Sequence, residues 1–338
     1  MTGGVTLHEV ARLAGVSLGS TSRALHGTGA SPDMVRRVRA AAEELGYRPN
    51  AAGRTLRMKK AFQVEFAVAD IGNPVYVEMM AAIHAVLAPH GYRTVVSSIG
   101  DRPSSINEVL RSLGDGHADG VIISPLRVDD DFPEIVRQTT IPVVAIGRSF
   151  RDLGIDSVAT DSASGIGLAV THLVAEGRRG IAFVNGPSDT TPGGSRQRGY
   201  DDAVAAPGFA AADLGTESAE DFTVAAGVAA GHRLLDRADQ RLDAVVAAND
   251  LLAIGVIRAA RERGLDVPGD LAVTGMDDTE IGRVFLPSLT SVSLGSAARG
   301  RLAAELMLAR LSDSPQEPEL ATVGPELKVR ESSVRRTR

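Results

Sequence analysis

The sequence of 338 residues predicts a small all-α head at the N-terminus and a large α/β body after it. Three observations support this fold class. Apolar residues in the first 45 positions recur with a helical period, and capping and turn residues divide them into three segments. From Val64 onward, short apolar runs alternate with helical patterns, as in doubly wound parallel sheets. The first 60 positions are also much more basic than the remainder.

The first two predicted helices form a helix-turn-helix. A first helical face is made by Leu7, Val10, Ala11 and Ala14. Gly15 supplies the turn, and Ser17 is a suitable N-cap for a second short helix that begins at Leu18. Two short helices joined in this way can place the second helix in the major groove of DNA.

A third helix is expected after a short turn. Ser31 is its predicted N-cap and Pro32 occupies its first position, while Gly46 ends it. Its apolar stripe consists of Val35, Val38, Ala42 and Leu45. The three predicted helices can therefore enclose one small apolar core.

The segment that follows the third helix is expected to fold only on a partner. Pro49 interrupts the chain, and Asn50 can cap a new, very short helix. An isolated helix of this length is marginal in water. Gly53 in its middle costs roughly another 1 kcal/mol relative to alanine.

Charge is distributed unevenly along the chain. Residues 1–60 carry ten basic and four acidic side chains, a formal charge of +6, whereas the rest carries 26 basic and 38 acidic ones, a formal charge of −12. This distribution favours contact with phosphates through one end of the protein. The alternative is a solvated surface whose charge happens to be uneven.

The α/β body is expected to form two subdomains, because at least seven strand-and-helix units can be distinguished. The strand candidates are Val64–Ala69, Thr94–Ser98, Gly120–Ser124, Val143–Ile146, Gly180–Val184, Ala244–Ala247 and Leu271–Gly275. The helices between them include Val77–Pro89, Gly165–Glu176, Ala225–Asp236 and Leu251–Arg263. Ligands of such sheets bind beyond the carboxyl ends of the strands.

Composition and motifs argue against several other classes. The sequence has no cysteine, no apolar run of transmembrane length and no signal peptide, so we expect a cytoplasmic protein without disulfides. The segment Gly165-Ile166-Gly167 lacks the third glycine of a dinucleotide fingerprint, and the seven histidines include no i, i+4 pair. No Gly-x-Ser-x-Gly elbow is present. We therefore expect no metal, no cofactor and no catalytic residue.

The head and the segment after it resemble the lactose-repressor (LacI) family of bacterial transcription regulators. The most specific match is Tyr47-x-Pro49-Asn50-x-x-x-Arg54-x-Leu56, and the resemblance covers essentially the whole chain. It implies a helix-turn-helix domain, a hinge helix, and an effector-binding and dimerisation domain of two periplasmic-binding-protein-like lobes. The implied boundaries are 1–48, 49–60 and 61–338, with lobe one at about 61–160 plus 291–322 and lobe two at about 161–290 plus 323–338.

The resemblance implies a homodimer that binds a pseudo-palindromic, double-stranded DNA operator. The positions that it assigns to DNA contact are Leu7, Ser17, Leu18, Gly19, Ser20, Ser22, Arg23, Asn50, Gly53, Arg54 and Leu56. Leu18 and Gly19 replace polar residues that are common in the family. Leu18 can touch a thymine methyl group, or it can be a core residue of the head. Leu56 stands where the family wedges a base step open.

Three further departures from the family affect the head and hinge. The turn from His26 to Ser31 is one residue shorter than the usual spacing. Met34 stands where threonine is common, and Gly53 where alanine is common. These changes bear on phosphate contacts and on the stability of the hinge helix, rather than on the fold.

The resemblance also implies a site for a small effector between the lobes. The positions that it assigns to effector contact are Tyr76, Asp161, Arg196, Phe222, Asn249 and Asp277. Carboxylate, amide and guanidinium groups around an aromatic wall suit a sugar or a nucleobase. Taken singly, Asn249 and Asp277 can equally be cap or turn residues, and Phe222 a core residue. No heptad repeat follows Arg330, so a dimer is the expected state.

The sequence thus predicts a DNA-binding repressor, not an enzyme, controlled by a small effector that is expected to be a carbohydrate. Three alternatives remain. The same regulator can use a purine or nucleoside as co-repressor. The chain can be a sugar-binding protein with a vestigial head. It can also be an enzyme on the same two-lobed fold, although no nucleophile with an adjacent base is visible.

Overall fold

The structure is a computed structural model in which residues 5–26, 29–47, 60–113, 116–237, 241–312 and 317–334 are described. The chain divides into two compact units, residues 1–60 and residues 61–338. The hinge positions Asn50, Gly53, Arg54 and Leu56 lie outside the described residues.

The first unit is a three-helix head. Its helices are α1 (Leu7–Ala14), α2 (Leu18–His26) and α3 (Pro32–Glu44). Gly15 adopts the left-handed conformation that the turn after α1 requires, with φ at 63°. Ser31 caps α3 by accepting a hydrogen bond from the Met34 N–H at 3.3 Å, and Pro32 begins the helix. The predicted turn and cap are therefore confirmed.

The helices of the head enclose a small apolar core. Val10 of α1, Ala24 of α2 and Val38 of α3 are fully buried in it. Arg37 of α3 donates a hydrogen bond to the Ala14 carbonyl oxygen at 2.5 Å. This bond satisfies one of the carbonyl groups left free at the end of α1, and it ties α3 to the turn.

The second unit contains two lobes, each built on one sheet. The sheet of lobe one has the order β11-β5-β4-β3-β1-β2, and its adjacent strands are parallel. Its strands are β1 (Gln63–Val68), β2 (Arg93–Ser98), β3 (Gly120–Ser124), β4 (Val143–Gly147), β5 (Asp156–Thr160) and β11 (Leu320–Val323). Its helices are α5 (Pro74–Leu87), η1 (Ala88–His90), α6 (Ser105–Ser112), α7 (Phe132–Gln138), η3 (Arg151–Leu153) and α13 (Ser296–Leu311).

The sheet of lobe two has the order β12-β10-β9-β8-β6-β7, and only its β10–β12 pair is antiparallel among the described strands. Its strands are β6 (Gly180–Asn185), β7 (Ala212–Ser218), β8 (Ala244–Ala247), β9 (Ala272–Met276), β10 (Thr290–Ser293) and β12 (Glu326–Lys328). Its helices are α8 (Ser162–Ala175), α9 (Thr191–Ala205), α10 (Val224–Arg237), α11 (Asp250–Glu262) and α12 (Glu280–Val284).

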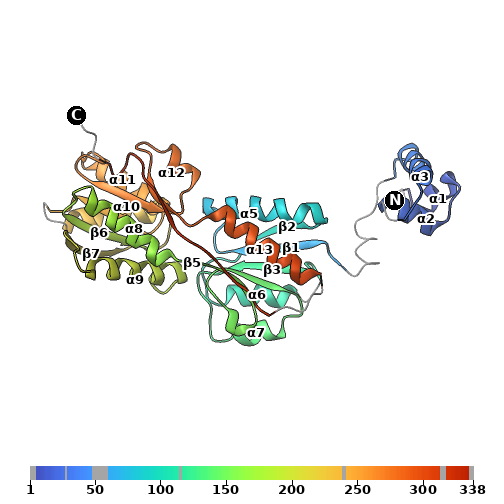
Figure 1. Ribbon diagram of the computed structural model, residues 1–338, viewed down its shortest axis with the longest axis horizontal. Helices are drawn as coiled ribbons and strands as arrows, with labels where there is room; N and C mark the ends of the chain where they lie inside the picture. Colours follow the sequence, from blue (N-terminus) through green and yellow to red (C-terminus); the bar gives the residue numbers. More distant parts are fainter. Residues whose placement is uncertain are drawn as a thin grey trace. The chain divides into compact units, whose positions relative to one another are not determined.

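Helices cover both faces of each sheet (Figure 1). In lobe one, α5 and α13 pack together over one face, and α6 and α7 enclose a separate apolar cluster on the other. In lobe two, α8 packs with α9, and α10 packs with α11. Every residue of β6, β8 and β9 is buried, which explains their continuous apolar sequence. The predicted doubly wound architecture is confirmed.

The chain crosses between the lobes three times within the described residues. The crossings follow β5, β10 and β11. The change of lobe expected at 290/291 falls inside β10, which stays paired with β9 as far as Val292. The change expected at 322/323 falls inside β11, whose Val323 still pairs with Thr160. The strand pairings thus carry both crossings a few residues beyond the expected boundaries.

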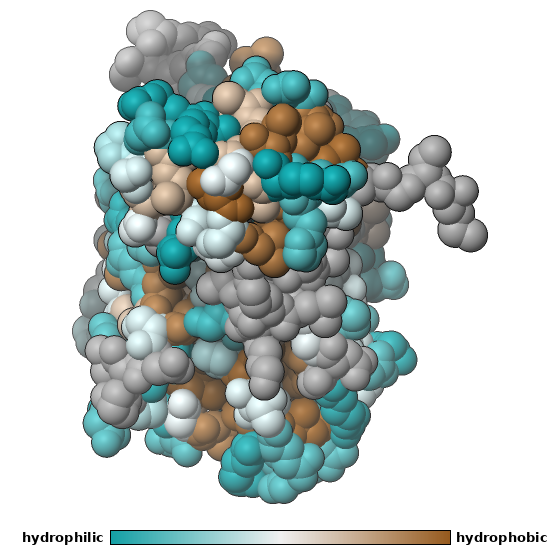
Figure 2. Space-filling view, turned by 90° about the vertical axis from the view of Figure 1, so that its right-hand side faces the viewer, coloured by the Kyte–Doolittle hydropathy of each residue, from teal (hydrophilic) through white to brown (hydrophobic). Residues whose placement is uncertain are grey.

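The surface carries scattered apolar residues. On the face shown in Figure 2, hydrophobic residues lie in separate groups among hydrophilic ones. Among the described residues, no helix is both long and apolar enough to span a membrane. The same part of the chain contains no cluster of three or more histidine or acidic side chains arranged to hold a metal ion.

Candidate functional site

Helix α2 presents a face that the head does not use for packing. Leu18 is 38% exposed, Arg23 is exposed, and Ala24 on the opposite side is fully buried. Leu18 and Ser22 are four positions apart, as are Gly19 and Arg23, so the four share the outward face. Leu18 lies outside the apolar cluster of the head. The alternative that Leu18 is a core residue is therefore wrong.

The start of α2 is held by its own serines. The Ser20 N–H donates to Ser17 Oγ at 3.2 Å, and the Arg23 guanidinium donates to Ser20 Oγ at 3.4 Å. A Cβ at Gly19 would meet nothing within 4 Å, so no packing requirement explains glycine there. Leu7 of α1 is half-buried. An exposed, basic second helix with a fixed first turn is suited to entering the major groove.

A cavity of about 1050 Å³ lies between the two lobes. Its walls come from the segments after β1, β3, β4 and β5 in lobe one, and after β6, β8 and β9 in lobe two. It therefore occupies the carboxyl ends of both parallel sheets, where open α/β folds bind their ligands. Of the six predicted effector residues, five line it, namely Tyr76, Arg196, Phe222, Asn249 and Asp277.

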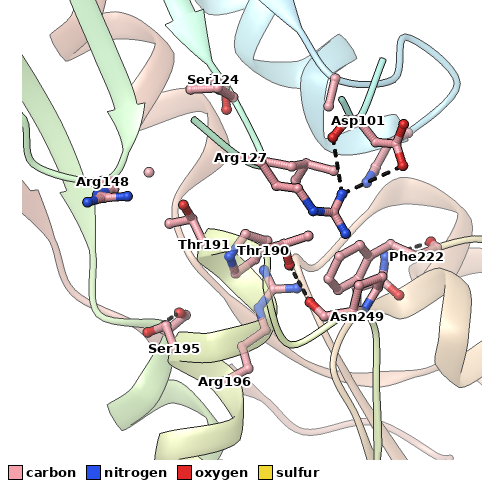
Figure 3. A pocket seen from close by; sticks show the side chains of 18 of the residues that line it. Asp101, Ser124, Arg127, Arg148, Thr190, Thr191, Ser195, Arg196, Phe222 and Asn249 are labelled. Carbon is pink, nitrogen blue, oxygen red and sulfur yellow. Dashed lines mark hydrogen bonds and ion pairs between the residues drawn. The ribbon is translucent and has the colours of Figure 1, made fainter. Parts of the chain in front are cut away.

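Arg196 and Asp277 form a buried ion pair in the cavity. The Arg196 guanidinium donates to Asp277 Oδ1 at 3.3 Å, and both side chains are more than 90% buried. Arg196 also lies 5.9 Å from the centroid of the Phe222 ring, which is within cation–π range. Figure 3 shows the side chains of Arg196, Phe222 and Arg127 gathered in one region of the cavity. Burial raises the pKa of Asp277, and Arg196 and Arg299 act against this rise.

Asn249 lies in lobe two and Tyr76 in lobe one, and hydrogen bonds hold both side chains in place. The Asn249 Oδ1 accepts a hydrogen bond from the Leu252 N–H at 2.8 Å, and its Nδ2 donates to the Phe222 carbonyl oxygen at 3.0 Å. Asn249 therefore caps α11 and also positions the aromatic wall. Burial raises the pKa of the Tyr76 hydroxyl, with an opposing hydrogen bond to Ser124.

Asp161 does not line the cavity. Its carboxylate is the N-cap of α8 and accepts a hydrogen bond from the Ser164 N–H at 3.0 Å. The hydrogen bonds with Ser164 lower the pKa of Asp161. We therefore leave it out of the proposed effector site, although the neighbouring Thr160 and Ser162 do line the cavity.

Four arginines of the cavity lining were not expected from the sequence, namely Arg127, Arg148, Arg198 and Arg299, and two of them bear directly on the site. Arg127, which follows β3, donates to both carboxylate oxygens of Asp189 across the cleft, at 2.7 and 2.8 Å. Arg299 lies in the first turn of α13, is only 5% exposed, and donates to Ser296 Oγ at 3.3 Å. Burial lowers its pKa to about 10. An arginine in the first turn of a helix is normally solvated. The sequence around Arg299 therefore did not indicate that this side chain would be buried in the cavity.

Asp250 is a buried carboxylate immediately behind the cavity wall. One oxygen accepts from the N–H and hydroxyl of Thr279, both at 2.7 Å, and the other accepts from Ser291 Oγ at 2.5 Å. Burial, and then the nearby charge of Asp277, raises the pKa of Asp250 to about 7. It therefore joins α11, α12 and β10 at the base of the site.

Two family models match the chain. Residues 6–50 match the model described as bacterial regulatory proteins of the lacI family, and residues 170–333 match the periplasmic binding protein-like domain. The chain is 34% identical to the HTH-type transcriptional regulator CelR of Thermobifida fusca, over 97% of this chain and 98% of that protein.

Two solved structures are similar over nearly the full length. The lac repressor dimer bound to operator and the anti-inducer ONPF is 25% identical, with a TM-score of 0.86, over 98% of this chain and 100% of that one. The CelR–cellobiose complex is 32% identical, with a TM-score of 0.72, over 97% and 99%. The expected resemblance is confirmed, and the chain belongs to the LacI family of DNA-binding transcriptional regulators, with a helix-turn-helix head and two α/β lobes.

Proposed function

We propose that the chain is a homodimeric repressor that reads a pseudo-palindromic operator through α2 and whose operator affinity changes when a carbohydrate enters the cavity between its lobes. The observation that carries this proposal is the cavity itself, because it lies at the strand ends of both lobes and combines a buried ion pair with an aromatic wall. Two neighbours support the assignment by their descriptions, one bound to operator and one bound to cellobiose.

The head supplies the DNA contacts in this proposal. Arg23 can pair with guanine or phosphate, Leu18 can contact a thymine methyl group, and the serines at the start of α2 can contact phosphates. Because Gly19 offers no side chain, base preference rests on few groups and partly on the deformability of the DNA. The hinge positions named above complete the expected DNA surface.

An operator selected from random DNA with the full-length protein tests the DNA part of the proposal. Arg23→Met should lower affinity for the selected site by roughly 5- to 150-fold if it pairs with guanine, with a smaller effect on unrelated DNA. Arg39→Met, an exposed arginine of α3, is the matched control and should weaken both kinds of DNA similarly. Failure to select any sequence would refute the proposal and favour a binding protein with a vestigial head.

Fluorescence anisotropy of the selected operator then tests the effector part. Neutral sugars, sugar acids, sugar phosphates and purines are added in turn, and each is scored by the change in operator affinity. The proposal requires a carbohydrate to produce the largest change, because an effector acts only through its different affinities for the two states. A change produced only by a purine or nucleoside would replace the carbohydrate assignment.

A further inference from the structure

The floor of the cavity contains more buried positive charge than negative charge. Arg196, Arg299 and Asp277 all line the cavity and are each at least 93% buried. Two guanidinium groups thus face one carboxylate. The other acids of the cavity lining are the exposed residues Asp70, Asp101, Asp189, Glu220 and Asp221.

The hydrogen bonds of the two guanidinium groups are incomplete. A guanidinium has five N–H donors. Within the described ranges, Arg196 donates one hydrogen bond, to Asp277, and Arg299 donates one, to Ser296. In the same part of the chain, the buried Nε atoms of both arginines have no hydrogen-bond partner. Buried charges are normally paired and fully hydrogen-bonded, so this arrangement lacks acceptor atoms.

Among the described residues, no carboxylate oxygen lies within 4.0 Å of the Arg299 guanidinium nitrogens, and its one hydrogen bond goes to Ser296. The charge of Asp277 favours the protonated form of Arg299, and the charge of Arg196 opposes it. Tyr76 and Glu78 have smaller effects, which also favour the protonated form. Glu78 is partly exposed and lies 3.9 Å from Arg283 of lobe two. Asp277 is therefore the one buried carboxylate whose charge acts on both cations, but among the described residues it is hydrogen-bonded to Arg196 alone.

The two cations come from different lobes. Arg196 is on α9 of lobe two, and Arg299 is in the first turn of α13, which packs against lobe one. The N-cap residue of α13 is Gly295, which provides no side-chain cap, so the first N–H groups of the helix add to the positive potential. A group that binds between Arg196 and Arg299 thus contacts both lobes at once.

We propose that the effector is an anionic sugar, bearing a carboxylate or a phosphate group that is bound between Arg196 and Arg299. The inference rests on the proposed function and narrows its ligand class. An anion supplies the missing negative charge and two or three acceptor oxygens, and guanidinium groups bind both kinds of oxyanion well. The sugar ring then lies against Phe222, with Asn249 and Tyr76 close by.

Calorimetry on the full-length protein with matched ligand pairs tests the inference. Glucose is compared with glucuronate and glucose 6-phosphate, which keep its ring, and cellobiose with cellobionate, while inorganic phosphate alone tests for simple anion binding. The charged member of a pair should bind about ten- to a hundredfold more tightly, the range for hydrogen bonds to a charged group. The glucuronate and glucose 6-phosphate arms distinguish a carboxylate site from a phosphate site.

Variants of α13 show whether Arg299 is responsible. Arg299→Met should abolish most of the preference for the charged member, and Arg299→Lys should retain part of it. Arg301→Met changes an exposed arginine on the same helix and should leave the preference intact. Because Arg299→Met removes an incompletely paired buried charge, its unfolding temperature should equal or exceed that of the wild type. The inference is overturned if no anionic ligand binds the wild type more tightly than it binds Arg299→Met.

Operator binding measured on the same samples separates the two proposals. If a neutral sugar changes operator affinity and its acids do not, the anionic effector is wrong and the repressor function stands. If anionic sugars bind in an Arg299-dependent manner but no selected DNA responds to them, the ligand class stands and the repressor function fails. Binding of inorganic phosphate alone, without any sugar derivative, would overturn the sugar part of the inference.

Discussion

The ion pair between Arg127 and Asp189 should stabilise the closed arrangement of the two lobes, and Asp189→Asn is the change that tests it. Arg127 follows β3 of lobe one and Asp189 follows β6 of lobe two, so the pair exists only when the lobes approach each other. Its geometry is bidentate, which is the favourable form for an arginine and a carboxylate. The hydrogen bonds from Arg127 are also the main reason why the pKa of Asp189 is lowered.

The expected effect is small because one partner is in solvent. The Arg127 side chain is 16% exposed, but that of Asp189 is 69% exposed. Exposed ion pairs contribute about 0.2–1 kcal/mol, which corresponds to roughly a 1.5- to 5-fold change in the lobe-closure equilibrium. If the effector binds the closed form, its apparent dissociation constant rises by up to the same factor, and by the full factor when the closed form is the minor species.

Calorimetry with the ligand that the wild type binds best provides the assay, at about 50 mM salt and again at about 0.5 M salt. The difference between Asp189→Asn and wild type should shrink at high salt, since an exposed pair is screened. Asp101→Asn is the control, because Asp101 contacts Arg127 from within lobe one, with its carboxylate at 3.6 Å. Equal behaviour of the two variants at both salt concentrations would refute the reasoning. A loss above tenfold in Asp189→Asn would show instead that Asp189 binds the effector directly.

Three further predictions concern stability. Because the pKa of Asp250 is about 7 in the folded protein and about 3.9 when unfolded, the proton it retains stabilises the fold fully below pH 4, and this contribution is lost as pH rises through 7. The free energy of unfolding, measured with urea, should therefore fall by about 2–3 kcal/mol more between pH 5 and 8 in wild type than in Asp250→Asn, and parallel pH profiles would contradict this. Gly199→Ala places a Cβ 2.3 Å from the Ala163 carbonyl oxygen and should destabilise the body by about 1–3 kcal/mol in thermal unfolding, whereas Gly167→Ala, which meets nothing within 4 Å, should not destabilise it. Ser31→Ala removes the cap of α3 and should cost the head about 1 kcal/mol, with Ser31→Gly costing only a few tenths.

Local sequence signals predicted the regular part of the fold well. The caps and turns of the head follow from residues that act within one helical turn, as Gly15 and Ser31 do. The buried strands of both lobes are continuous apolar runs, so β6 and β8 could be identified directly. Helix α5 starts at Pro74, three residues before the predicted start at Val77, because Asn73 caps it.

The strands that could not be identified from the sequence have little apolar pattern. Strand β7 is an edge strand with partly exposed residues and a glycine at positive φ, and β12 is only three residues long. Their positions depend on pairing with distant strands. The same limit applies to the site. Arg196 and Asp277 carry a family pattern, whereas the burial of Arg299 arises only because α13 enters lobe one directly after a crossing.

The balance between the mouth and the floor of the cavity decides what controls lobe closure. At the mouth, the Arg127–Asp189 pair favours closure by no more than about 1 kcal/mol. At the floor, closure brings Arg196 and Arg299 into each other's field, in surroundings where charges are screened far less than at the surface. Removing one partner from a buried charge pair typically costs about 3–5 kcal/mol, so an uncompensated charge at the floor outweighs the contact at the mouth. A ligand that supplies the missing negative charge relieves the repulsion between Arg196 and Arg299, which is larger than the contribution of the Arg127–Asp189 pair. Differential affinity for the closed state, which any effector of this protein requires, should therefore originate mainly at Arg299 and Arg196 rather than at the rim.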